Sequence, residues 1–112
     1  MYEIRNYHIN PKVFAAYVNW ARNIATPYLR AKLNVLGFWV NSEPAPEVNG
    51  TIDDPLGSAN VTWIIRWQDM DERREKFAEV FTNSTQWDEI FAKVPGGNDT
   101  YLRRETKFTE DV

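Results

Sequence analysis

The order of strand-like and helix-like segments is the feature that most narrows the fold of this chain. Runs typical of β-strands occupy residues 2–9, 35–40, 60–67 and 101–108. Amphipathic helical patterns fill the intervals before the second and the fourth run, which gives the order β-α-β-β-α-β. This order predicts a ferredoxin-like α+β fold, with a four-stranded antiparallel sheet and its helices on one face. With 112 residues, the chain is expected to form a single domain, 1–112.

The sequence of the first helical region indicates where the helix begins, where it is interrupted and where it ends. Asn10 is a typical N-cap and Pro11 suits the first helical position. Because proline disfavours helical backbone before it, Pro27 is expected to kink or restart the helix after Thr26. Asn34 is expected to end the region as a left-handed C-terminal cap.

The second helical region divides into two parts. Asp69 is expected to cap the first part, with Glu72 completing a capping box. The charged run at 71–76 (DERREK) is interpreted as a solvated helix face with weak charge pairs. Ser84 is expected to begin a second helix that ends near Val94. The apolar residues at helical spacing in the first part, expected to be buried, are Phe77, Val80 and Phe81.

Three further places in the chain carry information: a glycine within the second strand, the long connection after it and the C-terminal residues. Gly37 interrupts the second strand and predicts a β-bulge or a close backbone approach. Residues 41–59 form a long loop that contains three of the six prolines, and such loops are functional or merely mobile. We interpret it as a solvated flap or a lid, with hard-cation binding by its acids as the weaker alternative. Residues 109–112 form a short tail.

The strands keep large apolar groups on both parities, which indicates a partner for the face without helices. In the third strand Trp63 and Ile65 lie on one parity and Ile64 lies on the other. A half-solvated antiparallel sheet would show a polar face instead. We therefore predict a homodimer in which a second copy covers the bare face of the sheet.

Charge and composition exclude several classes of site. The formal net charge of −3 disfavours a nucleic-acid or anionic-membrane surface. The absence of cysteine excludes disulfides and thiolate metal sites, and a single histidine excludes a multi-imidazole centre within one chain. No apolar run reaches 18 residues, and the first residues read as a strand and not as a signal peptide. The expectation is a soluble cytoplasmic protein with no metal and no cofactor.

Three functional groups share one face of the first strand. Glu3, Arg5 and Tyr7 alternate along it and are the catalytic candidates. Arg5 could grip a carboxylate or an enolate, Tyr7 could donate to a developing oxyanion, and Glu3 could act as a general base. The alternative is a charge ladder in which Glu3 pairs with Arg103 and Arg5 pairs with Glu105 on the neighbouring last strand.

Aromatic residues supply the candidate wall of a binding pocket. They could enclose an apolar pocket between sheet and helix, or they could simply be core. His8, the only histidine, lies on the parity opposite the charged triplet, and a structural role is favoured over general-base chemistry. The predicted substrate-binding residues are Arg5, Tyr7, Tyr17, Trp20, Trp39, Trp63, Trp67 and Arg103.

Taken together, these features resemble the NIPSNAP family over nearly the whole chain. The opening strand has the pattern of that family at Tyr2, Ile4, Arg5 and Tyr7. Further along, the resembling positions are Pro11, Phe14, Trp20, Pro27, Gly37-Phe38-Trp39, the segment 67–73 and Trp87. The resemblance implies a dimeric α+β barrel. Barrels of this kind include cofactor-free monooxygenases, haem-degrading enzymes, isomerases and stress-response proteins, so the fold does not settle the function.

Two main functional interpretations follow. In the first, the protein binds a small aromatic or carboxylated molecule and acts on it as a cofactor-free, monooxygenase- or isomerase-like enzyme. In the second, it is a non-catalytic interaction or stress-related protein whose aromatic residues form the dimer seam. Haem binding is a weaker third possibility, because His8 would have to serve as the axial ligand.

Overall fold

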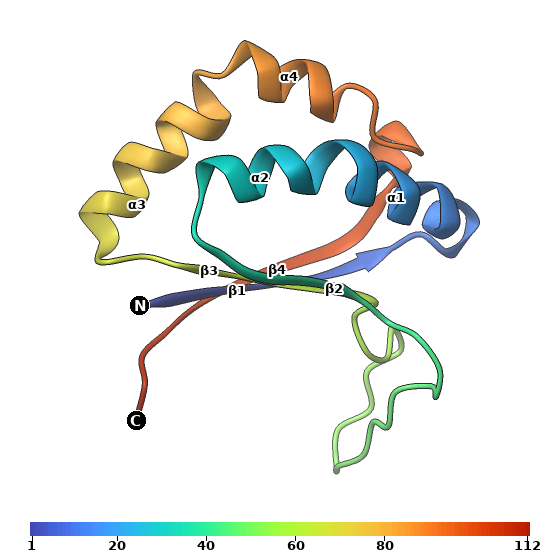
Figure 1. The fold of residues 1–112 in the computed structure, drawn as a ribbon. Helices are drawn as coiled ribbons and strands as arrows, with labels where there is room; N and C mark the ends of the chain where they lie inside the picture. The colour runs from blue at the N-terminus through green and yellow to red at the C-terminus, as the bar shows by residue number, and fades with distance from the viewer.

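The protein is described by a computed structural model that covers residues 1–112. All helices lie on one face of a single four-stranded sheet (Figure 1), so the predicted ferredoxin-like α+β fold is confirmed. No helix combines the length and the hydropathy needed to cross a bilayer. The elements in chain order are β1 (Tyr2–Ile9), η1 (Pro11–Val13), α1 (Phe14–Trp20), η2 (Ala21–Ala25), α2 (Thr26–Lys32), β2 (Val35–Val40), β3 (Val61–Arg66), α3 (Met70–Phe77), η3 (Ala78–Thr82), α4 (Thr85–Phe91), η4 (Gly97–Asp99) and β4 (Tyr101–Thr109).

The strand order β2-β3-β1-β4 places β1 in the middle of the sheet. All neighbouring strands are antiparallel, and β1 pairs with β3 and with β4. Arg5 lies opposite Trp63 on one side and opposite Thr106 on the other. The register of β2 against β3 shifts between Val35 and Gly37, which confirms the predicted bulge. The central position of β1 therefore gives each member of the charged triplet a neighbour on both sides, among them the aromatic residues Trp63 and Phe108.

The first helical layer runs without interruption from η1 through α2. The side chain of Asn10 accepts a hydrogen bond from the amide of Lys12, so the predicted cap is confirmed. The helix does not restart after Thr26. Immediately before Pro27, η2 forms a π-helical turn in which Thr26 N–H donates to the Ala21 carbonyl, and this wider turn accommodates the proline without ending the helix. The left-handed cap predicted at Asn34 is wrong, since only glycines have positive φ.

The second helical layer is built in the same way. Asp69 caps α3 by accepting from the amide of Glu72 at 2.8 Å, and Ser84 caps α4 by accepting from the amide of Trp87 at 3.1 Å, as predicted. Helix α4 ends at Phe91, shorter than expected. Between α3 and α4, η3 is a second π-helical turn. The Tyr28 hydroxyl of α2 donates to the carbonyl of η3 residue Val80 at 2.6 Å, which ties the two layers together.

The two faces of the sheet differ in character. The face under the helices holds the core residues Val61, Trp63 and Ile65, each at most 3% exposed. On the open face, β4 presents Arg103, Glu105 and Lys107. The expectation of large apolar groups on both parities of every strand is therefore wrong for β4, whose open face is charged.

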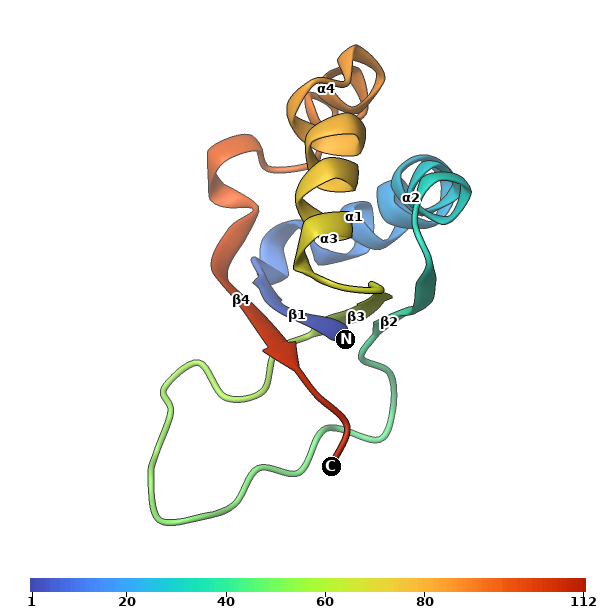
Figure 2. The same ribbon diagram turned by 90° about the vertical axis from the view of Figure 1, so that its left-hand side faces the viewer.

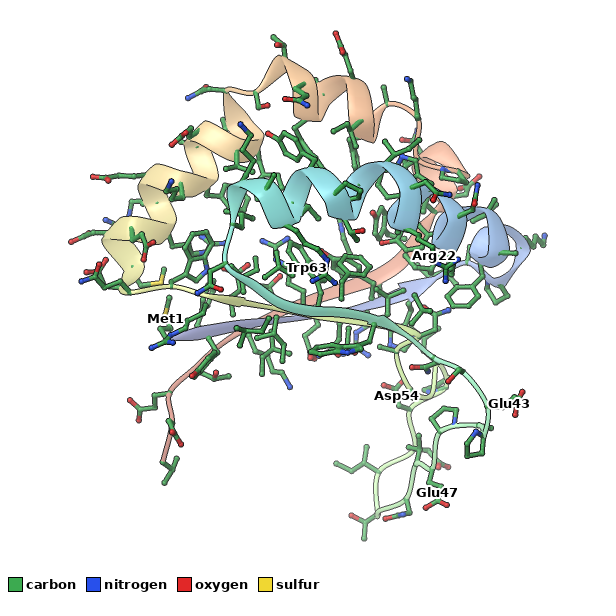
Figure 3. The ribbon with its side chains drawn as sticks, viewed as in Figure 1. Met1, Arg22, Glu43, Glu47, Asp54 and Trp63 are labelled. Carbon is green, nitrogen blue, oxygen red and sulfur yellow. The ribbon has the colours of Figure 1, made fainter.

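The long loop between β2 and β3 leaves the sheet on the open side, away from the helices (Figure 2). Asp54 in this loop pairs with Arg103 of β4 at 3.0 Å. The labelled loop residues Glu43 and Glu47 lie on the same side of the sheet as Asp54, whereas Trp63 lies on the helix side (Figure 3). This segment is therefore not a lid over the space between the sheet and the helices.

Candidate functional site

A cavity of about 210 Å³ lies between the sheet and the helices, and aromatic side chains make up most of its wall. The predicted apolar pocket thus has a physical counterpart on the covered face. Its floor comes from all four strands: Arg5, Tyr7, Phe38, Trp63, Tyr101 and Arg104. Its roof comes from the helical layers: Tyr17, Trp20, Ala25, Leu29, Phe77, Phe81, Trp87 and Phe91.

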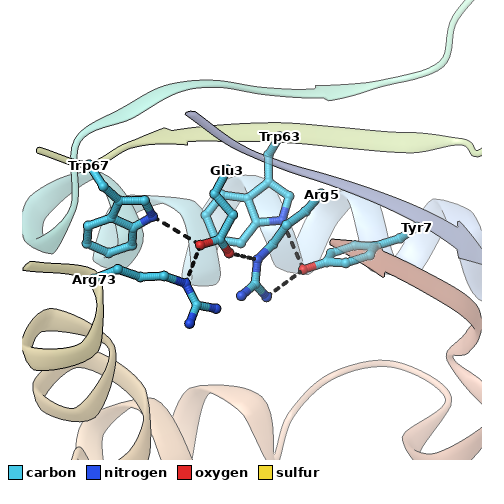
Figure 4. Close-up of polar contacts among 6 residues, drawn as sticks. All are labelled: Glu3, Arg5, Tyr7, Trp63, Trp67 and Arg73. Atoms are coloured by element: carbon cyan, nitrogen blue, oxygen red, sulfur yellow. Dashed lines mark hydrogen bonds and ion pairs between the residues drawn. The ribbon is translucent and has the colours of Figure 1, made fainter. Parts of the chain in front are cut away.

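Glu3 organises the polar groups beside this cavity (Figure 4). Its side chain is fully buried, and its Oε2 accepts from Arg5 Nε at 2.6 Å. Its Oε1 accepts from Arg73 Nε at 2.6 Å and from Trp67 Nε1 at 3.0 Å. Both oxygens are therefore satisfied, and two guanidinium groups share a single carboxylate.

The charge states of this cluster follow from its contacts. Burial acts to raise the pKa of Glu3, but the hydrogen bond from Arg73 and the charge of Arg5 hold that pKa below its ordinary value of 4.5. Burial acts to lower the pKa of Arg5, but contacts with Tyr7 and Glu3 raise it. At neutral pH the carboxylate is ionised and Arg5 is cationic. A carboxylate held in this way is a weak proton acceptor, which favours a positioning role for Glu3 over the predicted general base.

Tyr7 connects the charged cluster to the cavity. Its hydroxyl oxygen accepts from Trp63 Nε1 at 3.0 Å and from Arg5 Nη1 at 3.3 Å. A phenolic oxygen has two acceptor positions and one O–H donor. Because both acceptor positions are used by the protein, the Tyr7 O–H is the part of the group that remains for a bound molecule. Arg5 and Tyr7 together form a donor pair on the cavity floor.

Two further tyrosines add hydroxyls to the same floor and roof. Burial, together with the neighbouring hydroxyl of Tyr101, raises the pKa of Tyr17. Burial raises the pKa of Tyr101 to about 12, although its contact with Tyr17 acts to lower it. Both groups are protonated at neutral pH and can act as hydrogen-bond donors. The Cζ atom of Arg104 lies 5.0 Å from the centre of the Tyr101 ring, and Arg104 is, with Arg5, the second cation of the cavity wall.

The predicted charge ladder is wrong. Glu3 lies opposite Phe108 and not opposite Arg103, and Arg5 lies opposite Thr106 and not opposite Glu105. The last strand is offset from the assumed register, so its charged pair falls on the other face of the sheet. Arg103 faces His8 across the strands and belongs to the open face.

The other predicted binding residues divide into two groups. Tyr17, Trp20 and Trp63 line the cavity, together with Arg5 and Tyr7, whereas three predicted residues do not. Trp67 is buried next to Glu3, Trp39 is 51% exposed on the open face, and Arg103 is also on that face.

Arg73 is the residue that the sequence interpretation missed, because the 71–76 run reads as a solvated face. Its neighbour Arg74 does behave in that way and pairs with Asp71 at the surface. Arg73 instead turns inward to Glu3 and stacks over Phe77 at 4.7 Å. The signal is its spacing, since position 73 precedes Phe77 by four residues and shares the inward face of the helix.

The fold and the cavity define the class of this protein: it is a ferredoxin-like α+β protein with a pocket between its sheet and its helices. No family model and no curated protein matches the sequence. Solved structures do match. Protein Atu4242 of Agrobacterium tumefaciens, a NIPSNAP family protein with unknown function, has a TM-score of 0.75 at 20% identity, over 99% of this chain and 92% of that one.

Two further structures extend the comparison. An uncharacterised NIPSNAP domain protein from Burkholderia xenovorans has a TM-score of 0.71 at 15% identity, over 99% of this chain and 93% of that one. An antibiotic biosynthesis monooxygenase has a TM-score of 0.55 at 12% identity, over 100% and 99% of the two chains. The chain therefore has the fold of NIPSNAP family proteins, and the resemblance seen in the sequence is confirmed at the level of the fold.

Proposed function

We propose that this protein binds a small aromatic or carboxylated molecule in the cavity between its sheet and its helices. The observation that carries the proposal is the donor pair of Arg5 and Tyr7 within an otherwise aromatic wall. Binding sites for small molecules commonly combine an apolar lining with a few fixed polar groups. Arg5 is held by Glu3, and Tyr7 is held by Trp63, so the donors are positioned before any ligand arrives.

As an enzyme, the protein would act without a cofactor, in a monooxygenase- or isomerase-like reaction. Arg5 and the Tyr7 hydroxyl would stabilise negative charge on an enolate or phenolate oxygen of the substrate. An antibiotic biosynthesis monooxygenase shares this fold, and that analogy motivates the reaction class, whereas the proposed chemistry rests on the donors of the cavity floor.

Indole N–H signals in NMR spectra test the binding proposal directly. Trp63 lines the cavity and Trp39 lies outside it, so one chain carries both a reporter and an internal control. Small aromatic acids and amides should shift the Trp63 signal and leave the Trp39 signal in place. Tyr7→Phe should weaken binding several-fold, because the ligand loses the free O–H donor. If no member of such a set moves the Trp63 signal, the proposal fails.

We also propose that the protein is a homodimer joined through the open face. Trp39 is 51% exposed there, and a monomer would leave this large aromatic side chain in water. The charged residues of β4 would form the rim of such an interface. A homodimer of this kind is also compatible with the alternative function, a non-catalytic interaction protein.

Sedimentation of two tryptophan variants separates the seam from the cavity. Trp39→Ala should weaken self-association, whereas Trp63→Ala should leave the dimer intact and reduce ligand binding. A wild-type protein that sediments as a monomer of 13.1 kDa at micromolar concentration would contradict the dimer proposal.

A further inference from the structure

We infer that Arg5 and Arg73 together form a clamp for the carboxylate of an aromatic acid, at the edge of the cavity next to Phe77. The inference rests on the cavity being the binding site proposed above, and it names the class of ligand. It also assigns a binding role to Arg73, which is not part of the cavity wall itself.

The first support is the number of donors that remain. A guanidinium carries five N–H groups. Arg5 uses one on Glu3 and one on Tyr7, and Arg73 uses one on Glu3. Most N–H groups of both side chains therefore have no acceptor within the protein. A planar guanidinium fork matches the two oxygens of a carboxylate, so these donors suit an anion with paired oxygens.

The second support is the placement of the two groups. Both bind through Nε to the two oxygens of the same carboxylate, so their terminal nitrogens are brought to one neighbourhood. Figure 4 shows both guanidinium groups extending to the same side of Glu3, away from the strands. Both also stack on one ring, with the Cζ atoms of Arg73 and Arg5 at 4.7 and 5.7 Å from the centre of Phe77.

The third support is the charge of the cluster. One buried carboxylate faces two arginines whose side chains are only 16% and 20% exposed. The cluster therefore has a net charge of +1 on side chains that are mostly buried, and their unpaired nitrogens remain accessible. A bound anion would complete the pairing, because a partly desolvated cation gains from a charged acceptor.

The volume of the cavity next to the clamp limits the size of the apolar part of the ligand. Phe77 is part of both the cavity wall and the arginine stack, so it joins the two sites. An apolar cavity of about 150 Å³ holds benzene, and drug-sized pockets are roughly 300–1,000 Å³. At about 210 Å³, this cavity suits a molecule with one aromatic ring and a short side chain. Benzoate and phenylacetate are suitable probes.

The test compares each acid with the neutral amide of the same shape, benzamide and phenylacetamide, by following the Trp63 indole signal. The acids should bind at least about tenfold more tightly than the amides to the wild-type protein, as expected for hydrogen bonds to a charged group. Arg73→Met should weaken the acids about 10–100-fold and change the amides less than about twofold. Arg74→Met is the matched control, since it removes a neighbouring surface arginine and should change neither.

Arg73→Lys is the second variant, in case Arg73→Met does not fold. Lysine can keep the ion pair with Glu3 but lacks the fork, so it should also weaken the acids selectively. Equal binding of acids and amides, or equal loss of both in the Arg73 variants, would overturn the clamp and leave the cavity proposal standing. Failure of all four probes to bind the wild-type protein would overturn both.

Discussion

Replacing Glu3 by glutamine tests whether one buried carboxylate holds the charged cluster together. The substitution keeps the size of the side chain but removes the charge that Arg5 and Arg73 share. A glutamine also has one acceptor oxygen in place of two, so its NH₂ group must face a donor. The variant therefore leaves at least one buried guanidinium without its acceptor.

The expected loss follows from the burial of the pair. Removing one partner of a buried ion pair costs roughly 3–5 kcal/mol. The two arginine side chains keep 16% and 20% of their exposure and can recover some hydration, so the lower end of the range, about 3 kcal/mol, applies. For a domain of this length each kcal/mol lowers Tm by about 4 °C, which predicts a drop of about 12 °C at pH 7.

The loss should also depend on pH, because it comes from the ionised form of Glu3. The pKa of Glu3 is lowered in the folded state from 4.5. Its stabilising contribution is therefore complete above pH 4.5 and is lost as the pH falls through the folded-state pKa. The difference in Tm between wild type and Glu3→Gln should be constant from pH 7 to about pH 5 and should shrink below pH 4.5.

Thermal unfolding followed by circular dichroism, at one protein concentration and a series of pH values, measures both effects. Glu105→Gln is the control, because it makes the same chemical change in surface ion pairs of 3.8 and 3.9 Å and should cost less than about 1 kcal/mol. The prediction fails if Glu3→Gln costs no more than this control at pH 7, or if the gap in Tm stays the same in acid.

Three other substitutions test features around the site. Tyr28→Phe removes the hydroxyl that joins the two helical layers through the Val80 carbonyl and through Oγ of the α4 cap Ser84, and it should lower stability by about 1–2 kcal/mol in urea unfolding. Gly37→Ala would place a Cβ 1.9 Å from the ring of Trp39, so the indole signal of Trp39 should move while that of the cavity tryptophan Trp63 stays. Arg103→Ala removes the ion pair that holds the long loop, and limited proteolysis within that loop should become several-fold faster than in wild type; an unchanged cleavage rate would show that the pair does not restrain it.

Local patterns were enough to predict the elements, because their signals lie within a few residues. The first two strands have the predicted bounds, and the caps at Asn10, Asp69 and Ser84 form the expected hydrogen bonds. The backbone at Asn34 was mispredicted, since the turn into β2 stays extended at Leu33 and needs no left-handed residue. Propensity alone does not reveal which of several turn geometries the neighbouring strand selects.

The candidate site was predictable only in part, because it depends on contacts between distant segments. The face shared by Glu3, Arg5 and Tyr7 follows from the period of a strand. The partner of Glu3 does not, since Arg73 is 70 residues away and the alternative partner on β4 required a register that the pairing does not adopt. Trp39 was misplaced for the same kind of reason, because the bulge at Gly37 decides which residues of β2 face the helices.

The two π-helical turns have a consequence for how the cavity tolerates insertions and deletions. Each successive residue of a helix is rotated by about 100° from the last, and a π turn accommodates one residue more than an α turn. Loss of one residue from η2 would therefore restore α-helical winding and leave Leu29, which lies beyond it, on the roof of the cavity. Loss of one from η3 would shorten the connection to α4, which begins at its own cap, Ser84, and carries Trp87. A one-residue deletion in η2 should therefore disturb the chamber less than the same deletion in α1 or α2, where every following residue would turn by about 100°.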